Sequence, residues 1–347
     1  MSNLDSRPEE IECEAGGAPG GPEPGGAAVE IITSRDVPLG GARAMTVKRT
    51  LPQRQRSLIG AWCFVDHYGP DDVSATGGMD VPSHPHTGLQ TVSWLFEGNV
   101  THHDSGDNHA VVRPGEVNLM TSGAGICHTE VSTQDTGVLH GVQLWTVLPE
   151  RDRESSGRGF EHYVPESVEY EGGSALVFIG SLLGSSSSVT TFTPLLGAEL
   201  RLDPGARLTV DVDPQFEHGL LVDAGDITLE GVTVEPTQLG YTGVGETSLT
   251  ISNTGSTPAR MILIGGTPFG EEIVMWWNFI GRTHDEILRY RQEWEAGSDR
   301  FGRVDGYIGR TPDGLTRLPA PALPGSVLTP RANPAARAQT GDPARTD

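Results

Sequence analysis

Two short motifs in the first half of the chain have the spacing of metal ligands. His84-Pro85-His86 and His128-Thr129-Glu130 each place two polar side chains at positions i and i+2. In an extended strand these positions point to the same face, so each motif can direct both of its side chains into one interior. Two such strands facing each other would surround one point with three imidazole nitrogens and one carboxylate. This donor set suits a divalent metal and leaves coordination positions open for dioxygen, water or substrate.

The histidines of the chain are concentrated around these two motifs. Eleven histidines occur, and eight of them lie between His67 and His140. A single pair of histidines at i and i+2 is more often a surface pair than a ligand pair, and the second motif is what favours a metal site. We therefore predict four metal ligands: His84, His86, His128 and Glu130. This set favours Fe2+, with Mn, Co, Ni, Cu or Zn as alternatives.

Other polar residues of this region have simpler explanations. His102 and His103 follow a turn and are expected at the surface, whereas His140 lies in an apolar strand and is expected to be a hydrogen-bonded core residue. His67 either orients a ligand or water of the metal site or has no part in it. Cys127 is expected to be a buried structural thiol rather than a redox centre.

The sequence around the motifs predicts short strands separated by turns. The chain of 347 residues contains 46 glycines and 25 prolines, which favours a β-rich fold. Strands are expected at 91–96 and 138–147, and the same order returns at 218–223 and 257–264. Two copies of one antiparallel strand set indicate two similar barrels joined near residues 150–165.

The second barrel lacks a pair of histidines at this spacing. Asp211 and Asp213 occupy the corresponding place, counted back from the matched turns. Two carboxylates can bind a hard cation, but a solvated strand start is the simpler expectation. The second barrel is therefore predicted to stabilise or shape the first.

One helix is predicted near the end of the chain. Thr283 has the position of an N-cap residue with Glu286 three residues later, and Gly297 offers a stop. Ile287, Tyr290 and Trp294 share one helical face, which is expected to dock on a barrel.

The expected fold class is all-β, with two antiparallel barrels in tandem and a short C-terminal helix. We place the metal-binding barrel at residues 28–150, the second barrel at 151–275 and the helical segment at 276–318. The polar N-terminal residues 1–27 and the Pro/Ala/Arg-rich residues 319–347 are predicted to be disordered tails.

Composition excludes several classes of partner. The net charge of −22 repels phosphate backbones and anionic lipid, so direct nucleic-acid or membrane binding is not expected. The three cysteines do not suggest a disulfide framework, and the N-terminus lacks the features of a secretion signal. A cytoplasmic monomer is the simplest expectation.

The motifs and their order along the chain resemble the pirin family of bicupins, which includes bacterial quercetinase-like proteins. The resemblance is dense over residues 58–150 and thinner over 160–300. The segments that carry it include Phe64–Pro70, His84–Gly88, Pro114-Gly115, Gly123–Glu130 and Leu139–Trp145, and Gly265–Glu286 resembles the final segment of the family. It implies two jelly-roll type cupin barrels and the same four ligands. Gln90 departs from the pattern, because many relatives carry glutamate there.

The resemblance implies two kinds of function. The first is a quercetin 2,3-dioxygenase-type oxidoreductase that acts on a flavonol-like substrate and O2, with Glu130 as a ligand and transient general base. The alternative is a metal-dependent regulatory protein of the transcription-cofactor type, which would bind a protein partner. A storage or structural barrel with an incidental metal is a third, weaker interpretation.

Overall fold

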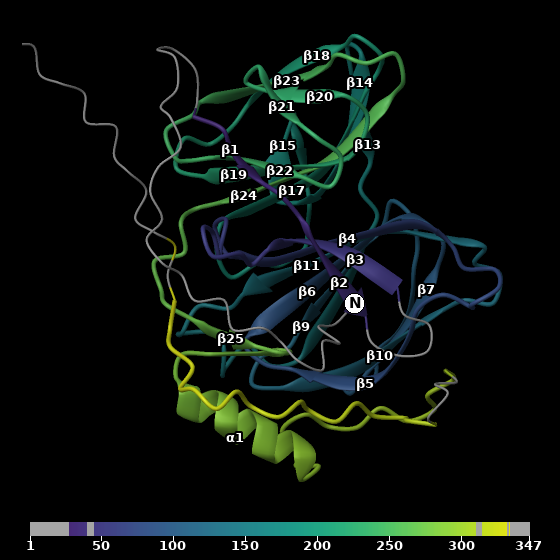
Figure 1. Ribbon diagram of the computed structural model, residues 1–347, viewed down its shortest axis with the longest axis vertical. Coiled ribbons are helices and arrows are strands. Elements are labelled where there is room, and N and C mark those ends of the chain that lie inside the picture. The colour runs from purple at the N-terminus through teal and green to yellow at the C-terminus, as the bar shows by residue number, and fades with distance from the viewer. Residues whose placement is uncertain (1–27, 40–44, 310–313, 332, 334–347) are drawn as a thin grey trace, which may run out of the picture.

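The computed structural model describes residues 28–39, 45–309, 314–331 and 333, and it is built almost entirely of antiparallel strands. Figure 1 shows two β-barrels one above the other, with the single helix beside the first barrel. Each barrel consists of a seven-stranded sheet that faces a four-stranded sheet. The predicted all-β architecture with a C-terminal helix is therefore confirmed. Among the described residues, no helix is both long and apolar enough to cross a bilayer.

The first barrel contains both histidine motifs. Its larger sheet has the order β12 (Gly159–Tyr163), β9 (Val117–Thr121), β6 (Leu89–Glu97), β11 (Val138–Val147), β4 (Trp62–Asp72), β3 (Met45–Leu51) and β2 (Arg35–Leu39). Its smaller sheet has the order β5 (Asp80–His86), β10 (Ile126–Ser132), β7 (Val100–Asp104) and β8 (His109–Val112). Both motifs therefore lie on neighbouring strands of the smaller sheet.

The second barrel repeats this plan. Its larger sheet has the order β1 (Glu30–Ile32), β22 (Leu239–Thr242), β19 (Glu217–Ala224), β24 (Ala259–Gly266), β17 (Leu195–Leu202), β14 (Gly173–Ile179) and β13 (Ser167–Tyr170). Its smaller sheet has the order β18 (Arg207–Asp211), β23 (Ser248–Asn253), β20 (Ile227–Leu229) and β21 (Val232–Val234). Two short hairpins complete the strands: β15 (Ser181–Leu182) with β16 (Ser185–Ser186), and β25 (Val274–Trp276) with β26 (Phe279–Gly281).

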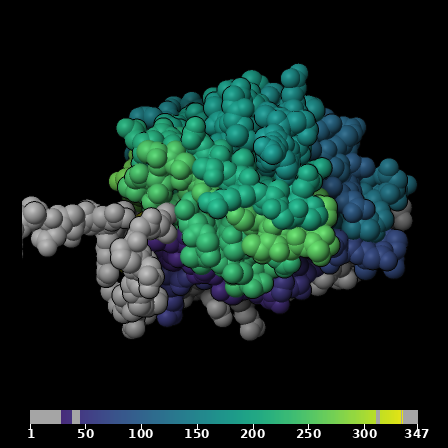
Figure 2. Space-filling view, turned by 90° about the horizontal axis from the view of Figure 1, so that it is seen from above, coloured from purple at the N-terminus to yellow at the C-terminus, as the bar shows by residue number. Residues whose placement is uncertain are grey.

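The two barrels share one hydrophobic core between their larger sheets. Trp94 of the first barrel stacks on Phe178 of the second with ring centroids 4.6 Å apart. The indole nitrogens find acceptors across the same boundary: Nε1 of Trp94 donates to Glu199 at 2.7 Å, and Nε1 of Trp62 donates to the carbonyl of Gly265 at 3.0 Å. Buried aromatic rings with satisfied polar atoms hold the barrels together. In Figure 2 the teal-to-green second barrel covers most of the visible face.

The strands divide between the barrels differently from the expected domain boundaries. β1 comes before the first barrel in sequence, yet its Ile31 pairs with Gly240 in the sheet of the second barrel. β12 lies beyond the expected end of the first barrel at residue 150, yet its Phe160 pairs with Met120 in the sheet of the first barrel. Each barrel thus takes an edge strand from the other side of the boundary, because edge strands pair wherever a sheet leaves an open edge.

The C-terminal helix α1 (His284–Glu295) begins and packs as predicted. The hydroxyl of Thr283 accepts a hydrogen bond from the backbone of Glu286 at 3.3 Å, as an N-cap does. Ile287, Tyr290 and Trp294 are buried on the face that packs against the hairpin of β25 and β26. The helix therefore docks on the first barrel through this hairpin.

Part of the expected C-terminal tail packs against this helix. Ala320 and Leu328 are buried in the same cluster as Trp294, so residues 319–331 differ from the free tail that composition suggested. The side chain of Asn333 accepts hydrogen bonds from the backbone of Ser57 and Leu58. The predicted tail at 1–27 and the remainder of the C-terminal one, residues 332 and 334–347, lie outside the described residues.

A candidate metal centre

The position of β5 at the edge of its sheet explains how a proline can stand between two predicted ligands. β5 pairs with β10 alone in the four-stranded sheet, so Pro85 does not need a backbone N–H for a second neighbour. His84 and His86 then project from the same face of β5. In the antiparallel register His128 of β10 lies directly opposite His84. The two motifs therefore meet as the spacing predicted.

The three imidazoles converge on one point. Each offers a ring nitrogen, and these nitrogens all lie within 4.8 Å of one another. Nε2 of His86 and Nε2 of His128 are 3.0 Å apart. Two ligands at right angles on a metal with bonds of about 2.1 Å are separated by about 3.0 Å. The spacing thus fits two neighbouring positions of an octahedron.

Burial keeps these imidazoles in the form that binds metals. All three rings are at most 1% exposed. Desolvation lowers the pKa of His84 to about 4, although the charge of Glu130 partly opposes this shift. Desolvation, followed by the neighbouring imidazoles, places the pKa of His86 and His128 well below the ordinary value. Neutral imidazoles keep a lone pair for a cation, so the cluster fits a divalent metal.

Hydrogen bonds at the far side of the rings orient two of these nitrogens. Nδ1 of His84 lies 2.8 Å from the carbonyl of Pro82, so it donates there and leaves Nε2 to face the cluster. Nδ1 of His128 lies 3.2 Å from Nδ1 of His102. His102 is 4% exposed, so the expectation that it lies at the surface is wrong. The turn before β7 suggested exposure, but alternation along the strand directs His102 inward and leaves His103 partly exposed.

Glu130 lies on the same strand as His128 but stands apart from the three imidazoles. Its side chain is buried, and a register shift between His128 and Glu130 places it opposite Val81 of β5. Its carboxylate does not belong to the group of atoms within 4.8 Å of one another. Its negative charge opposes the lowering of the pKa of His84. It also adds to the rise in the pKa of Tyr68, of which burial is the larger cause. The structure thus joins three of the four predicted ligands and leaves the fourth in the same interior.

Comparisons with known proteins agree with this architecture. Residues 44–146 match the Pirin family model, and residues 197–302 match the model of the Pirin C-terminal cupin domain. This chain belongs to the pirin family. It is 40% identical over 329 residues to a Pseudomonas aeruginosa protein provisionally named a quercetin 2,3-dioxygenase. The aligned region covers 94% of this chain and 99% of the relative.

Solved structures of other proteins show the same two-cupin fold. A crystal structure of quercetin 2,3-dioxygenase from Acinetobacter baumannii matches with a TM-score of 0.80 and 36% identity, over 88% of this chain and 98% of that one. A bacterial pirin from Escherichia coli, crystallised in complex with nickel(II), matches with a TM-score of 0.54 and 17% identity, over 70% of this chain and 100% of that one. The more distant structure supports the pirin fold alone.

Gln90, the position that departs from the pirin pattern, is occupied by hydrogen bonds away from the imidazoles. Its amide nitrogen donates to Thr121 Oγ1 at 2.9 Å and to the carbonyl of Thr190 at 3.0 Å. Its amide oxygen accepts from the hydroxyl of Thr146 at 3.3 Å. The side chain is buried, and these bonds lead to β9, to β11 and to the segment between β16 and β17.

Replacing Gln90 with glutamate is therefore expected to destabilise this pirin without changing the metal site. The Gln90→Glu variant would set a carboxylate against the carbonyl of Thr190 and lose the amide donor, which costs about 1–3 kcal/mol for a buried unsatisfied group. Urea unfolding would measure this loss, and a Co2+ titration should give a dissociation constant within about twofold of wild type. A tightening of Co2+ binding by tenfold or more would show that position 90 reaches the metal.

A second histidine cluster lies between the two barrels. Nε2 of His67 and Nε2 of His140 each lie 2.6 Å from the same oxygen of Asp223, which belongs to β19 of the second barrel. Arg260 donates to the other oxygen of Asp223 at 2.7 Å, and its Nη2 lies 3.2 Å from Nδ1 of His140. The prediction of a hydrogen-bonded core residue is right for His140. The alternative role of His67 beside the metal is not supported, because its Nε2 is engaged by Asp223.

These atoms could in principle hold a cation, but the arrangement favours hydrogen bonds. Both imidazoles approach one carboxylate oxygen as donors, and the permanently charged guanidinium of Arg260 already neutralises Asp223. A divalent ion here would add two positive charges beside that guanidinium. We interpret the cluster as a clamp between the barrels.

The remaining predicted residues fit their simpler explanations. Cys127 is 1% exposed, and burial raises the pKa of its thiol, which suits a structural role. Asp211 and Asp213 are exposed at the end of β18. The structure therefore gives the second barrel no acidic interior at the place that corresponds to the histidine pair.

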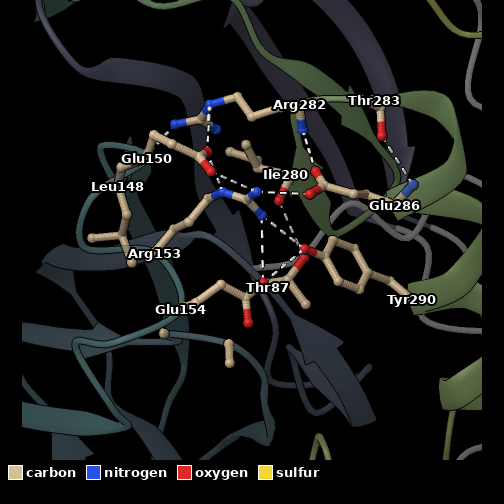
Figure 3. A network of polar contacts seen from close by, with 12 residues as sticks. Thr87, Leu148, Glu150, Arg153, Glu154, Ile280, Arg282, Thr283, Glu286 and Tyr290 are labelled. Carbon is tan, nitrogen blue, oxygen red and sulfur yellow. Dashed lines mark hydrogen bonds and ion pairs between the residues drawn. The ribbon is translucent and has the colours of Figure 1, made fainter.

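The C-terminal hairpin covers one side of the metal centre. Thr87 bridges to Phe279, and the backbone of Asn278 hydrogen-bonds His86, directly beside the imidazole cluster. A polar network shown in Figure 3 fixes the helix that follows this hairpin. Arg153 donates to Glu150, to Glu286 at 2.7 Å and to the hydroxyl of Tyr290 at 3.0 Å. The segment after β11 thereby holds the helix and the hairpin against the site.

Proposed function

We propose that this pirin is a metal-dependent dioxygenase of the quercetin 2,3-dioxygenase type. The observation that carries the proposal is the convergence of three buried, neutral imidazoles, His84, His86 and His128, on one point inside the first barrel. The names of the Pseudomonas and Acinetobacter relatives support the choice of reaction. Fe2+ is the metal that three imidazoles and a carboxylate favour, and Mn, Co, Ni, Cu and Zn accept the same donors.

In this proposal Glu130 serves the centre in two ways. Its carboxylate would complete the ligand set, since Glu130 is buried in the same barrel and its charge acts on His84. Its other role is that of a general base, which accepts the proton of the substrate hydroxyl on a carboxylate oxygen. When bound, the metal supplies a Lewis acid that favours the deprotonated form of a coordinated hydroxyl group.

Aromatic side chains lie beside the imidazoles. Trp145 meets His86 edge-on with ring centroids 5.2 Å apart, and it stacks on Phe64 at 4.0 Å. These rings form an apolar wall next to a small number of polar groups, which is typical of sites that bind aromatic ligands. Flavonols combine such a ring system with a hydroxyl group that can lose its proton.

The proposal is tested by oxygen uptake. The protein is purified without chelators, analysed for metal, and reconstituted anaerobically with Fe, Mn, Co, Ni or Cu. We expect quercetin to stimulate oxygen consumption with at least one of these metals, and a flavone without the 3-hydroxyl group to remain inert. Absence of quercetin-dependent uptake with all five metals would refute the assignment.

A further inference from the structure

His128 is the end of a buried chain of hydrogen bonds that leads away from the metal centre. Nδ1 of His128 lies 3.2 Å from Nδ1 of His102, and Nε2 of His102 lies 3.1 Å from Oδ2 of Asp104. His102 and Asp104 are 4% and 3% exposed. Both belong to β7, the neighbour of β10 in the smaller sheet, and the strand register places Asp104 directly opposite His128.

The carboxylate of Asp104 is fixed by its own turn. It accepts hydrogen bonds from the backbone N–H of Gly106 at 2.7 Å and from the side-chain amide of Asn108 at 3.0 Å. Burial alone would raise the pKa of Asp104, but His102 and these donors lower it below its ordinary value. An ionised carboxylate can only accept, so the proton between Asp104 and His102 belongs to Nε2 of His102.

This assignment fixes the remaining protons of the chain. A neutral His102 with its proton on Nε2 presents the lone pair of Nδ1, which accepts a hydrogen bond from Nδ1–H of His128. Nε2 of His128 then carries a lone pair, and this is the nitrogen that lies 3.0 Å from Nε2 of His86. For His84 the carbonyl of Pro82 performs the same task through a single bond.

We propose that His102 and Asp104 are positioning residues that hold His128 in the tautomer able to bind the metal. The inference rests on the proposed function, because it assumes that His84, His86 and His128 share a metal ion. Partners that orient a ligating histidine generally contribute 10–100-fold to metal affinity. The chain from His128 to Asp104 therefore makes β7 a part of the centre, although it provides no ligand.

The decisive variant is Asp104→Asn. Its remaining oxygen can keep the bonds from Gly106 and Asn108, while its amide N–H turns toward His102. His102 must then accept on Nε2 and donate from Nδ1, which forces the proton of His128 onto Nε2, where the metal should bind. We expect the affinity for Co2+ to fall by about 10–100-fold. A second variant, His102→Phe, removes the acceptor while keeping a ring beside Phe160, and should give a similar loss.

Two measurements separate positioning from a general loss of structure. Nitrogen-15 NMR of the metal-free protein should show His128 protonated on Nδ1 in wild type and on Nε2 in Asp104→Asn. Co2+ titration, followed by visible absorption, should show the loss of affinity. His103→Phe is the matched control, since this neighbouring, partly exposed residue of β7 contacts His109 instead of the centre, and it should bind Co2+ as wild type does.

The outcomes also distinguish this inference from the proposed function. Equal Co2+ affinity of wild type, Asp104→Asn and His102→Phe would overturn the positioning role while leaving the metal site intact. Wild-type His128 protonated on Nε2 in the metal-free protein would overturn it as well. If wild type binds neither Co2+ nor any other of the five metals, the proposed function fails, and the tautomer measurement still decides which proton arrangement the chain imposes.

Discussion

Replacement of His128 with alanine is expected to weaken Co2+ binding by more than 100-fold and to abolish quercetin-dependent oxygen uptake. Loss of a partner that only orients a ligand costs 10–100-fold in affinity, so loss of one of three converging nitrogens must cost more. Calorimetric titration of the metal-free protein would measure the affinity. The same experiment should give one metal ion per wild-type chain, because the cluster around Asp223 is engaged by Arg260.

Thermal unfolding provides an independent measure of the same change. A ligand present at 1,000 times its dissociation constant stabilises the folded state by about 4 kcal/mol, and a loss of affinity of more than 100-fold should leave less than about 1.4 kcal/mol of this gain in His128→Ala. His109→Ala is the control, because His109 is an exposed histidine of the same barrel. Tight binding of one Co2+ ion by His128→Ala would contradict the proposed ligand set.

The convergence of the three imidazoles was predictable because most of its information is local. His84 and His86 lie at positions i and i+2 of a strand, and the strand period alone places both side chains on one face. Only the pairing of β5 with β10, which brings His128 opposite His84, required the fold. The position of Glu130 was harder to predict from the sequence, because the register shift that follows His128 does not leave a signature in the residue types.

Residues that support the centre were harder to predict than its ligands. His102 follows a turn, and two adjacent histidines give no indication of which one points inward until the register of β7 is known. The pattern His102-x-Asp104 is the available signal, since two residues on one face of a strand can form a hydrogen-bonded pair. The partner of His67 lies 156 positions away in the other barrel, so local spacing could not reveal it.

The fold was predictable to the level of two repeated barrels, and the exchange of edge strands was not. The strands expected at 91–96 and 138–147 correspond to β6 and β11, and those expected at 218–223 and 257–264 correspond to β19 and β24. β1 and β12 are short, and their residue types suit either barrel. Which sheet they extend depends on the open edges of the assembled barrels, and therefore on tertiary structure.

Replacing Asp223 with asparagine is expected to lower the free energy of unfolding by about 3 kcal/mol, the lower part of the range for breaking a buried ion pair. The carboxylate accepts from His67, His140 and Arg260, and only its negative charge satisfies all three donors. The amide of Asp223→Asn would set an N–H against the guanidinium of Arg260. Urea unfolding of the metal-free proteins at neutral pH measures the difference.

The dependence on pH tests whether the charge of Asp223 is responsible. Burial would raise the pKa of Asp223, but the hydrogen bonds from His140 and His67 and the charge of Arg260 lower it below its ordinary value. A depressed pKa contributes stability that is complete above the unfolded value of about 3.9 and is lost as the pH falls through the folded value. The stability difference between wild type and Asp223→Asn should therefore shrink in acid below about pH 4. Asp211→Asn, an exposed carboxylate of the same barrel, should match wild type within about 0.5 kcal/mol at neutral pH. Equal urea midpoints for wild type and Asp223→Asn would show that the charge of Asp223 does not help to join the barrels.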